Sequence, residues 1–336
     1  MAFKLDLQNN IVYAGHMKFE VKKIAGSAAH SAFTDLCLWN GNLYCCFREA
    51  ENHISNDGRI CILQLDLMGD TLNKTWVTEP RSDLRDPKLT VTPDNKLMLL
   101  VYQRKFQEES TTAYCKPAIY LSNSGISWSS QRKIGHNYWW LWRLRWHSIE
   151  HDTCLQPEHK AWGFAYNRAA NRIQLYCGDP RSNFQVHKKE VLSLAKHNLG
   201  YPNESDIVFI DKTAYAIVRR DADSCTAQLG NSCWPFKTWQ WTDLGTYIGG
   251  PCMILKDKKS AWVAGRIWEK QQFKTALFNL NFNQQKFALK AILPSSGDNS
   301  YPGLVQHANK LYLSYYSSHK DSKSQIFLAQ FDINEL

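Results

Sequence analysis

Short apolar runs dominate this chain of 336 residues, and they constrain its fold more than any other feature. The runs are rich in β-branched and aromatic residues and are separated by Gly, Asn, Asp and Pro, as strands are. Apolar residues at helical spacing are scarce apart from a possible short turn at 190–196. The runs lie at 36–47, 60–67, 96–102, 118–121, 161–166, 173–177, 207–210, 214–218, 253–255, 262–267, 275–280, 311–316 and 325–331. The sequence therefore predicts an all-β protein.

Tight turns join many of these runs in pairs. Hairpin signals lie at 39–42, 92–95, 211–213 and 307–309, each between an incoming strand and an outgoing strand rich in apolar side chains. A repeated two-strand unit of this kind is the element from which propeller blades are built. The spacing favours six blades, with five as the alternative, and no linker interrupts the chain. We expect residues 1–336 to form a single β-propeller domain.

The composition indicates in which cellular compartment such a domain is expected. The sequence is 44% hydrophobic, which is ample for a core, yet no window has the roughly 18 apolar residues of a membrane span, and the start lacks a signal-peptide pattern. Ten scattered cysteines without a CxxC pair are typical of buried free thiols, although Cys225 and Cys233 flank one polar loop and could pair in an exported protein. We expect a monomer without a membrane partner, cytoplasmic or exported without a classical signal peptide.

The net charge of +9 is compatible with nucleic acid, an anionic surface or an acidic small substrate as partner. Because the lysines are dispersed, with no run of five or more, a nucleic-acid partner is not expected, and the charge also fits an ordinary solvated surface. His147, His151 and His159 are irregularly spaced, and no Gly-rich phosphate loop occurs. We therefore expect no metal and no cofactor.

Several segments together resemble those of the sialidase family. Residues 121–128, Leu-Ser-Asn-Ser-Gly-Ile-Ser-Trp, resemble a degenerate Asp-box, the turn at the blade edges of sialidases, and 66–76 are a weaker echo. The order of four further segments, 47–60, 202–205, 219–221 and 265–266, followed by the tyrosine segment 299–305, is also similar to that family. The resemblance spans the chain from about position 30 to the C-terminus and implies a sialidase-like glycoside hydrolase that acts on a carbohydrate with an anionic sugar.

The resemblance implies a role for each of these segments. Tyr301 would be the nucleophile, Glu204 its base and Asp57 the acid, which suits a carboxylate-bearing sugar because a neutral phenol does not repel it. Arginines bind carboxylates bidentately, and those that would hold the sugar are Arg48, Arg219 and Arg266, with Arg85 in reserve. The sequence departs from the family where Phe-Arg-Ile-Pro is usual: the matching stretch is Ala32-Phe33-Thr34-Asp35, without the first arginine.

Two other functions stay open. Asp35, Asp86 and Glu204 fall in an order similar to that of five-bladed furanosidase-type propellers, which use carboxylates alone on neutral sugars. A propeller that only binds glycans or proteins is the third possibility, since a fold does not fix a function. The aromatic stretch 138–146 fits either a sugar platform or core packing, and strand alternation would send Trp140, Trp142 and Leu144 to one side.

Overall fold

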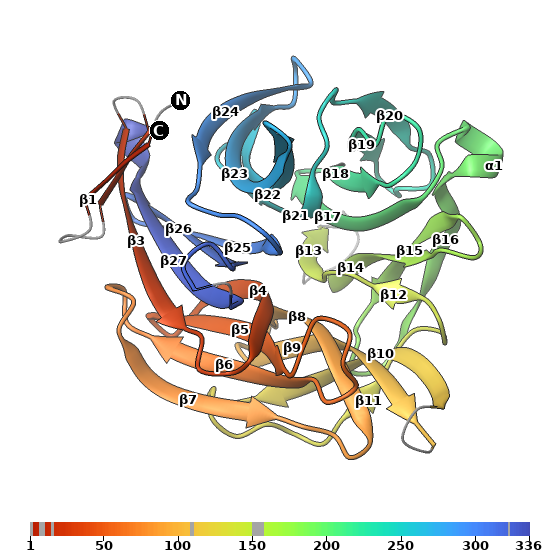
Figure 1. Cartoon of the computed structure of the whole chain (residues 1–336). Helices are drawn as coiled ribbons and strands as arrows, with labels where there is room; N and C mark the ends of the chain where they lie inside the picture. Colours follow the sequence, from red (N-terminus) through yellow and green to blue (C-terminus); the bar gives the residue numbers. More distant parts are fainter. Residues whose placement is uncertain (1–2, 7–10, 15–16, 108–110, 150–157, 322) are drawn as a thin grey trace.

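Six antiparallel sheets form one closed ring in the computed structural model, which describes residues 3–6, 11–14, 17–107, 111–149, 158–321 and 323–336 (Figure 1). The protein is an all-β six-bladed propeller, as the sequence predicts, and the five-bladed alternative is wrong. Of the helical turn predicted at 190–196, only residues 194–196 lie in the short helix α1 (Leu194–His197), which Ser193 caps, while 190–193 belong to a strand. The chain ends in the 3-10 helix η1 (Ile333–Glu335).

The first three blades follow one another along the chain. Their strands, inner strand first, are β4 (His30–Trp39), β5 (Asn42–Ala50), β6 (Arg59–Leu65) and β7 (Thr71–Val77); then β8 (Ser82–Val91), β9 (Leu97–Phe106), β10 (Thr112–Ser122) and β11 (Arg132–Lys133); then β12 (Trp140–Leu141), β13 (Arg145–Ile149), β14 (Glu158–Asn167), β15 (Arg172–Gly178) and β16 (Phe184–Ser193). In the third blade, both β12 and β13 pair with β14.

The last three blades complete the ring. Their strands are β17 (Pro202–Ile210), β18 (Thr213–Arg220), β19 (Gln228–Cys233) and β20 (Gln240–Asp243); then β21 (Gly249–Leu255), β22 (Ser260–Glu269), β23 (Gln272–Asn281) and β24 (Lys286–Ile292); then β25 (Asn299–His307), β26 (Lys310–Ser317), β27 (Gln325–Asp332), β3 (Met17–Ala25), β2 (Ile11–Ala14) and β1 (Phe3–Asp6). Because β3 pairs with β27, the sixth blade joins strands from both ends of the chain and closes the ring.

Most inner strands carry a bulge near the start of the strand. Register shifts occur within Ala32–Asp35, Arg85–Lys88, Pro202–Ser205, Gly249–Cys252 and Ser300–Gly303. Four of these shifts contain a residue in the left-handed region: Phe33 (φ 62°), Asp86 (φ 44°), Gly250 (φ 58°) and Tyr301 (φ 47°). Such a conformation is uncommon for residues other than glycine and tends to occur at functional sites. The bulges re-aim side chains near the centre of the ring.

The degenerate Asp-box forms the turn between β10 and β11, as its motif predicts. The Ser122 hydroxyl accepts the Gly125 amide at 2.8 Å and donates to the Ser127 carbonyl at 2.6 Å. Gly125 has a φ of 74°, and an added Cβ would lie 2.4 Å from the Tyr44 ring. Trp128 packs against the core shared by the first two blades. A serine therefore caps the turn in place of the usual aspartate.

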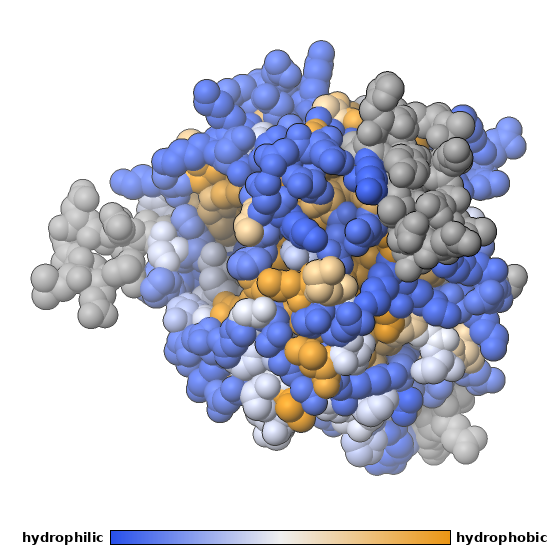
Figure 2. All heavy atoms as spheres, turned by 90° about the vertical axis from the view of Figure 1, so that its left-hand side faces the viewer, coloured by the Kyte–Doolittle hydropathy of each residue, from blue (hydrophilic) through white to orange (hydrophobic). Residues whose placement is uncertain are grey.

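Figure 2 shows the side of the ring on which β3 lies, where a largely hydrophilic surface surrounds smaller apolar areas. The nine described cysteines are all unpaired, including Cys225 and Cys233, while Cys154 and His151 lie outside the described residues. Within the described part of the chain, no helix has the length and apolar character needed to span a bilayer.

Candidate active site

A cavity of about 620 Å³ opens at the centre of the ring, on the face that carries the β5–β6 and β14–β15 turns. Residues from five inner strands or strand ends reach it, among them Phe33, Asp86, Trp140, Glu204 and Tyr301. This size and central position are typical of small-molecule sites. The bulged residues Phe33, Asp86 and Tyr301 all belong to its lining.

Tyr301 and Glu204 meet in this cavity across 97 positions of sequence. The Tyr301 hydroxyl donates to Glu204 Oε1 at 2.6 Å. Glu204 Oε2 accepts the Gly250 amide at 2.7 Å and Arg219 Nη1 at 2.7 Å. Arg219 Nη1 also lies 3.2 Å from the Tyr301 oxygen. The phenol is thus held between a carboxylate and a guanidinium, the arrangement that an activated hydroxyl nucleophile needs.

These contacts set the protonation states of the pair. Burial by itself would raise the pKa of Glu204, but Arg219, the Tyr301 hydroxyl and the Gly250 amide together hold that pKa below its ordinary value. Burial raises the pKa of Tyr301 well above its usual range, and the Glu204 charge adds to this shift. At neutral pH the pair is therefore a neutral phenol that donates to an ionised carboxylate.

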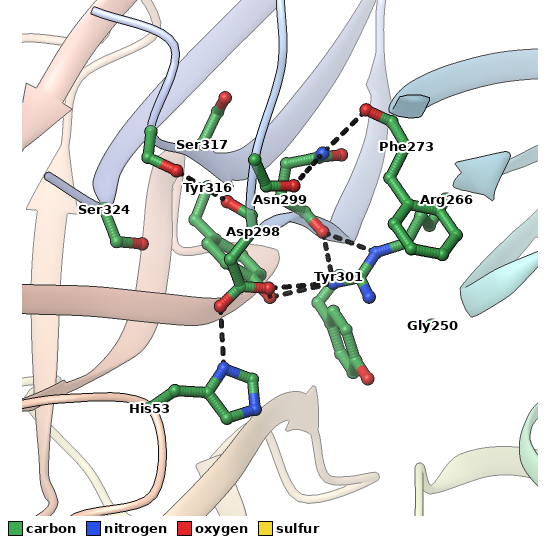
Figure 3. Close-up of polar contacts among 12 residues, drawn as sticks. His53, Gly250, Arg266, Phe273, Asp298, Asn299, Tyr301, Tyr316, Ser317 and Ser324 are labelled. Atoms are coloured by element: carbon green, nitrogen blue, oxygen red, sulfur yellow. Dashed lines mark hydrogen bonds and ion pairs between the residues drawn. The ribbon is translucent and has the colours of Figure 1, made fainter. Parts of the chain in front are cut away.

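Two of the three arginines implied by the family resemblance lie beside Tyr301. Arg219 also donates from Nε to Asp221 at 2.8 Å. Arg266 lies with its guanidinium carbon 5.2 Å from the centre of the Tyr301 ring and donates from Nε to the Asn299 carbonyl at 2.8 Å (Figure 3). Arg219 Nη2 and Arg266 Nη1 donate to none of the described residues. These nitrogens remain as donors for an anionic ligand.

The structure does not bring Arg48 to the cavity. Its side chain is fully buried, and its nitrogens donate to Asp83 (2.8 Å), the Asn52 carbonyl (3.0 Å) and the Ser55 carbonyl (2.7 Å). Arg48 therefore fixes the loop between β5 and β6. Arg85, the reserve, lines the cavity instead.

Phe33 occupies the place where the family's first arginine is expected. It lines the cavity, its ring lies 5.3 Å from that of Tyr301, and the Arg85 guanidinium carbon lies 5.4 Å from its centre. Arg85 donates to Asp83 at 3.0 Å and to the His53 carbonyl at 2.9 Å. At this wall of the cavity, the Phe33 ring and the Arg85 guanidinium group thus stand where the family resemblance implies a single arginine.

Asp86 is the second carboxylate of the cavity. Neither of its oxygens accepts a hydrogen bond from any described residue, although the side chain is largely buried and lines the cavity. Burial raises the pKa of Asp86, Lys88 and Arg85 oppose the shift, and the Glu204 charge adds to it. An unpaired carboxyl group with a raised pKa is a common feature of catalytic sites.

Two other predicted carboxylates lie elsewhere. Asp57 is exposed and accepts the Glu51 amide at 3.0 Å; burial would raise its pKa, but hydrogen bonds from Ser55 and the Glu51 amide lower it instead. Asp35 is fully buried outside the cavity lining, where it accepts Arg143 Nη1 at 2.6 Å and the Leu89 amide at 2.8 Å. Neither residue meets Tyr301 in the cavity.

Part of the aromatic stretch 138–146 forms one wall of the cavity. Trp140 stacks on Tyr102, with ring centres 3.9 Å apart, and on Tyr166 at 5.8 Å. Trp142 also lines the cavity. Strand alternation predicts Leu144 on the same side as Trp140 and Trp142, but Leu144 does not line the cavity. The chain is irregular between β12 and β13, so Leu144 packs with Leu141 in a different core cluster. The stretch therefore supplies both cavity wall and core.

Sequence reasoning missed two basic residues of the cavity, Arg104 and Arg168. Arg104 lies in β9 after its apolar run, and Arg168 lies in the polar turn that follows Asn167, so neither stands in a recognisable motif. A period-two reading of β9 places Arg104 on the same side as Tyr102, and this is the signal that could have found it.

Among the described residues, His30, His53 and Asp298 form the group whose potential ligand atoms all lie within 4.8 Å of one another. His53 Nδ1 is 2.7 Å from Asp298 Oδ2, and His30 Nε2 is 3.5 Å from the same oxygen. Two ligands of a tetrahedral zinc ion lie about 3.3 Å apart. The 2.7 Å contact between His53 Nδ1 and Asp298 Oδ2 is shorter than this spacing and has the length of a hydrogen bond.

No protein-family model and no curated protein matches the chain. Solved structures do. A protein of unknown function from Dyadobacter fermentans aligns with a TM-score of 0.71 at 16% identity, over 93% of this chain and 99% of its own. The Trypanosoma rangeli sialidase in complex with sialic acid aligns with a TM-score of 0.64 at 12% identity, over 91% of this chain. The NanB sialidase of Streptococcus pneumoniae aligns with a TM-score of 0.62 at 11% identity.

The fold is that of the sialidase propellers. The chain spans 54% of the trypanosomal enzyme and 70% of NanB, so the likeness covers the propeller and not the whole of those proteins. At these identities the comparison concerns the fold. What this sialidase-type propeller does must be argued from its own cavity.

Proposed function

We propose that this protein is a glycoside hydrolase that removes a terminal acidic sugar, sialic acid or a related nonulosonic acid, from a glycan with retention of configuration. The observation that carries the proposal is the 2.6 Å contact between Tyr301 and Glu204 at the wall of a central cavity. A neutral phenol paired with an ionised carboxylate is suited to attack a sugar that itself bears a carboxylate.

In this reaction Glu204 takes the proton of Tyr301 while the phenolic oxygen bonds to the anomeric carbon. The bond from that carbon to the departing oxygen breaks, and water later releases the sugar from Tyr301. Arg219 and Arg266 hold the sugar carboxylate through the nitrogens that donate to no described residue, and Arg85 takes the role first assigned to Arg48.

Charge supports an anionic substrate. Five arginines lie in or next to the cavity: Arg85, Arg104, Arg168, Arg219 and Arg266. Against them stand the carboxylates Asp86 and Glu204 of the cavity, with Asp83, Asp221 and Asp298 behind. The cavity lining itself holds three arginines, Arg85, Arg104 and Arg168, against its two carboxylates, and this local excess favours an acidic ligand over a neutral one.

The carboxylate-only mechanism on neutral sugars has weaker support. It needs Asp35, whose two oxygens are occupied by Arg143 and the Leu89 amide away from the cavity. A propeller that only binds glycans is favoured by one observation, the aromatic wall of Tyr102, Trp140 and Tyr166, on which a sugar face can stack.

The test is release of a fluorophore from an α-linked sialic acid reporter by the wild type and by Tyr301→Phe. We expect turnover by the wild type and a loss of at least about 10³-fold in the variant. Tyr215→Phe is the matched control, because Tyr215 stacks on Phe282 and is not among the residues that line the cavity. Activity only on a neutral furanoside would favour the carboxylate mechanism, and saturable glycan binding without turnover would favour a binding propeller.

A further inference from the structure

His53 reaches the cavity from the loop between β5 and β6, and the mechanism above does not use it. Its side chain is 47% exposed, and its Nδ1 lies 2.7 Å from Asp298 Oδ2. In Figure 3 the second ring nitrogen of His53 points away from Asp298. That nitrogen contacts none of the described residues. One nitrogen is therefore anchored and the other is left for a ligand.

Asp298 is itself firmly held at the start of β25. Its Oδ1 accepts the Tyr316 hydroxyl at 2.7 Å and Arg266 Nη2 at 3.2 Å. Its Oδ2 faces His53 and, at 3.5 Å, His30 Nε2. Burial alone would raise the pKa of Asp298, but hydrogen bonds from His30, His53 and Tyr316 hold it far below its ordinary range. An ionised carboxylate thus fixes the orientation of the His53 imidazole.

The same ring packs beside the proposed nucleophile. The centre of the His53 ring lies 5.0 Å from that of Phe33, edge to face, and the Phe33 ring lies 5.3 Å from that of Tyr301. The His53 carbonyl accepts Arg85 Nη2 at 2.9 Å, which fixes the loop backbone at this residue. His53 and Tyr301 therefore both pack against the same phenylalanine at the wall of one cavity.

We propose that His53, oriented by Asp298, is the acid that protonates the departing oxygen. The inference rests on the proposed function. The imidazolium gives its Nε2 proton to the oxygen as the bond to the anomeric carbon breaks, and Tyr301 forms its bond to that carbon while Glu204 takes the phenolic proton. In the second step neutral His53 takes a proton from the attacking water, and Glu204 returns its proton to Tyr301.

Charged and titratable groups face His53 from three elements. His30 lies on β4, Arg85 on β8 and Asp298 on the segment that leads into β25. Arg266 and Tyr316 lie behind Asp298 on its other oxygen. Of these groups Asp298 makes the direct 2.7 Å contact with the ring, so it is the residue that orients the His53 imidazole.

The test compares two acidic-sugar substrates that differ only in the leaving group, one an electron-poor phenol and the other a sugar hydroxyl. Protonation matters little for the phenol and greatly for the alcohol. We expect His53→Gln to lower kcat about 10² to 10⁴-fold on the sugar-linked substrate and less than about 10-fold on the aryl substrate. His307→Gln, at an exposed histidine at the far end of β25, is the matched control and should leave both rates unchanged.

Other outcomes overturn the proposal. Equal losses on both substrates, or no loss, would remove His53 from the acid role while leaving the proposed function intact. A selective loss in Asp57→Asn instead would assign the acid to that residue. Silence of the wild type on both substrates would overturn the proposed function, and the acid role with it, because there would be no departing oxygen to protonate.

Asp298→Asn tests the positioning role. If Asp298 orients the His53 imidazole for proton transfer, this variant lowers kcat on the sugar-linked substrate much more than on the aryl substrate. A purely structural role would lower kcat on both substrates by the same factor, and that result would overturn the assignment. Thermal unfolding of each variant, compared with the wild type, separates these effects from loss of the fold.

Discussion

The inner strands of the propeller carry charged side chains at two levels that behave in opposite ways. At the cavity level lie Asp86 and Glu204, and two residues further along the same strands lie Lys88 and Asp206 at the axis of the ring. A register shift spans the cavity-level residue on each strand, within Arg85–Lys88 and within Pro202–Ser205, so a bulge separates the two levels. At the cavity level Asp86 accepts no hydrogen bond from a described residue, whereas at the axis level Asp206 is paired with two arginines.

The axis network is sealed. Arg143 lies 2.6 Å from Asp35 and 3.3 Å from Asp206, and Arg145 lies 2.6 Å from Asp206. Asp206 also accepts the Met253 amide at 2.8 Å. Two carboxylates thus balance two guanidinium groups from three blades. Burial lowers the pKa of the fifth group, Lys88, with the charge of Arg143 adding to the shift.

The difference teaches that burial of charge does not by itself mark a site. Asp35 and Asp206 are at least as buried as Asp86, yet every oxygen of the axis pair accepts hydrogen bonds from the ring itself, whereas Asp86 accepts none from a described residue. The cavity residues keep capacity for a ligand because the bulges at Phe33, Asp86 and Tyr301 turn them toward open space. Stability should therefore depend on the axis level and chemistry on the cavity level.

The largest expected effect is on stability, from Asp206→Asn. Loss of this carboxylate leaves Arg143 and Arg145 without their shared partner, and breaking a buried ion pair lowers the free energy of unfolding by about 3–5 kcal/mol. Denaturant unfolding measures it. The control Asp211→Asn, at an exposed aspartate that contacts Lys258, should stay within about 0.5 kcal/mol. Equal free energies of unfolding for Asp206→Asn and Asp211→Asn would contradict the conclusion that stability depends on the axis level.

Next comes Glu204→Gln, two positions earlier on the same strand. We expect kcat to fall about 10² to 10³-fold because the base of Tyr301 is removed. The loss of stability should be smaller than for Asp206→Asn, since Arg219 keeps Asp221 as a partner. Reporter turnover and denaturant unfolding on the same preparations test this. A variant that loses stability but keeps kcat would place Glu204 with the axis residues.

The smallest effect is a pH-dependent difference in stability between the two cavity carboxylates. The folded-state pKa of Asp86 is raised, chiefly by burial, so Asp86 destabilises the folded protein as pH rises through that pKa. Asp86→Asn should match the wild type below about pH 4 and exceed it at neutral pH by under about 1 kcal/mol. Unfolding measured between these pH values tests it.

Glu204 has the opposite sign. Its folded-state pKa is lowered against the effect of burial, so its contribution to stability is present above the ordinary carboxyl range and is lost as pH falls. Glu204→Gln should therefore lie below the wild type at neutral pH and approach it in acid. The same trend for both variants would contradict the difference in their surroundings.

Local pattern determined the fold and part of the site. Alternating apolar runs and tight turns predict the blades, and Tyr301, Glu204, Arg219 and Arg266, predicted from segment order, lie together at the ring centre. The roles of Arg48 and Asp57 could not be judged in the same way. The positions of Arg48 and Asp57 in the sequence fit the family pattern. In the folded protein, however, Arg48 donates to Asp83 and Asp57 accepts the Glu51 amide, and these contacts depend on the tertiary structure.

The sequence by itself determined that the chain forms short strands and turns, because side-chain alternation and turn residues act over a few neighbours. The sequence also contains the segments of Glu204 and Tyr301 in the order that resembles the sialidase family. Only the tertiary structure decided which of the many charged residues face the cavity. A bulge shifts the side of the strand on which the next side chains lie, and ring closure sets which strands face one another. These contacts join residues hundreds of positions apart, as Thr34 and Tyr301 do, and no local pattern encodes them.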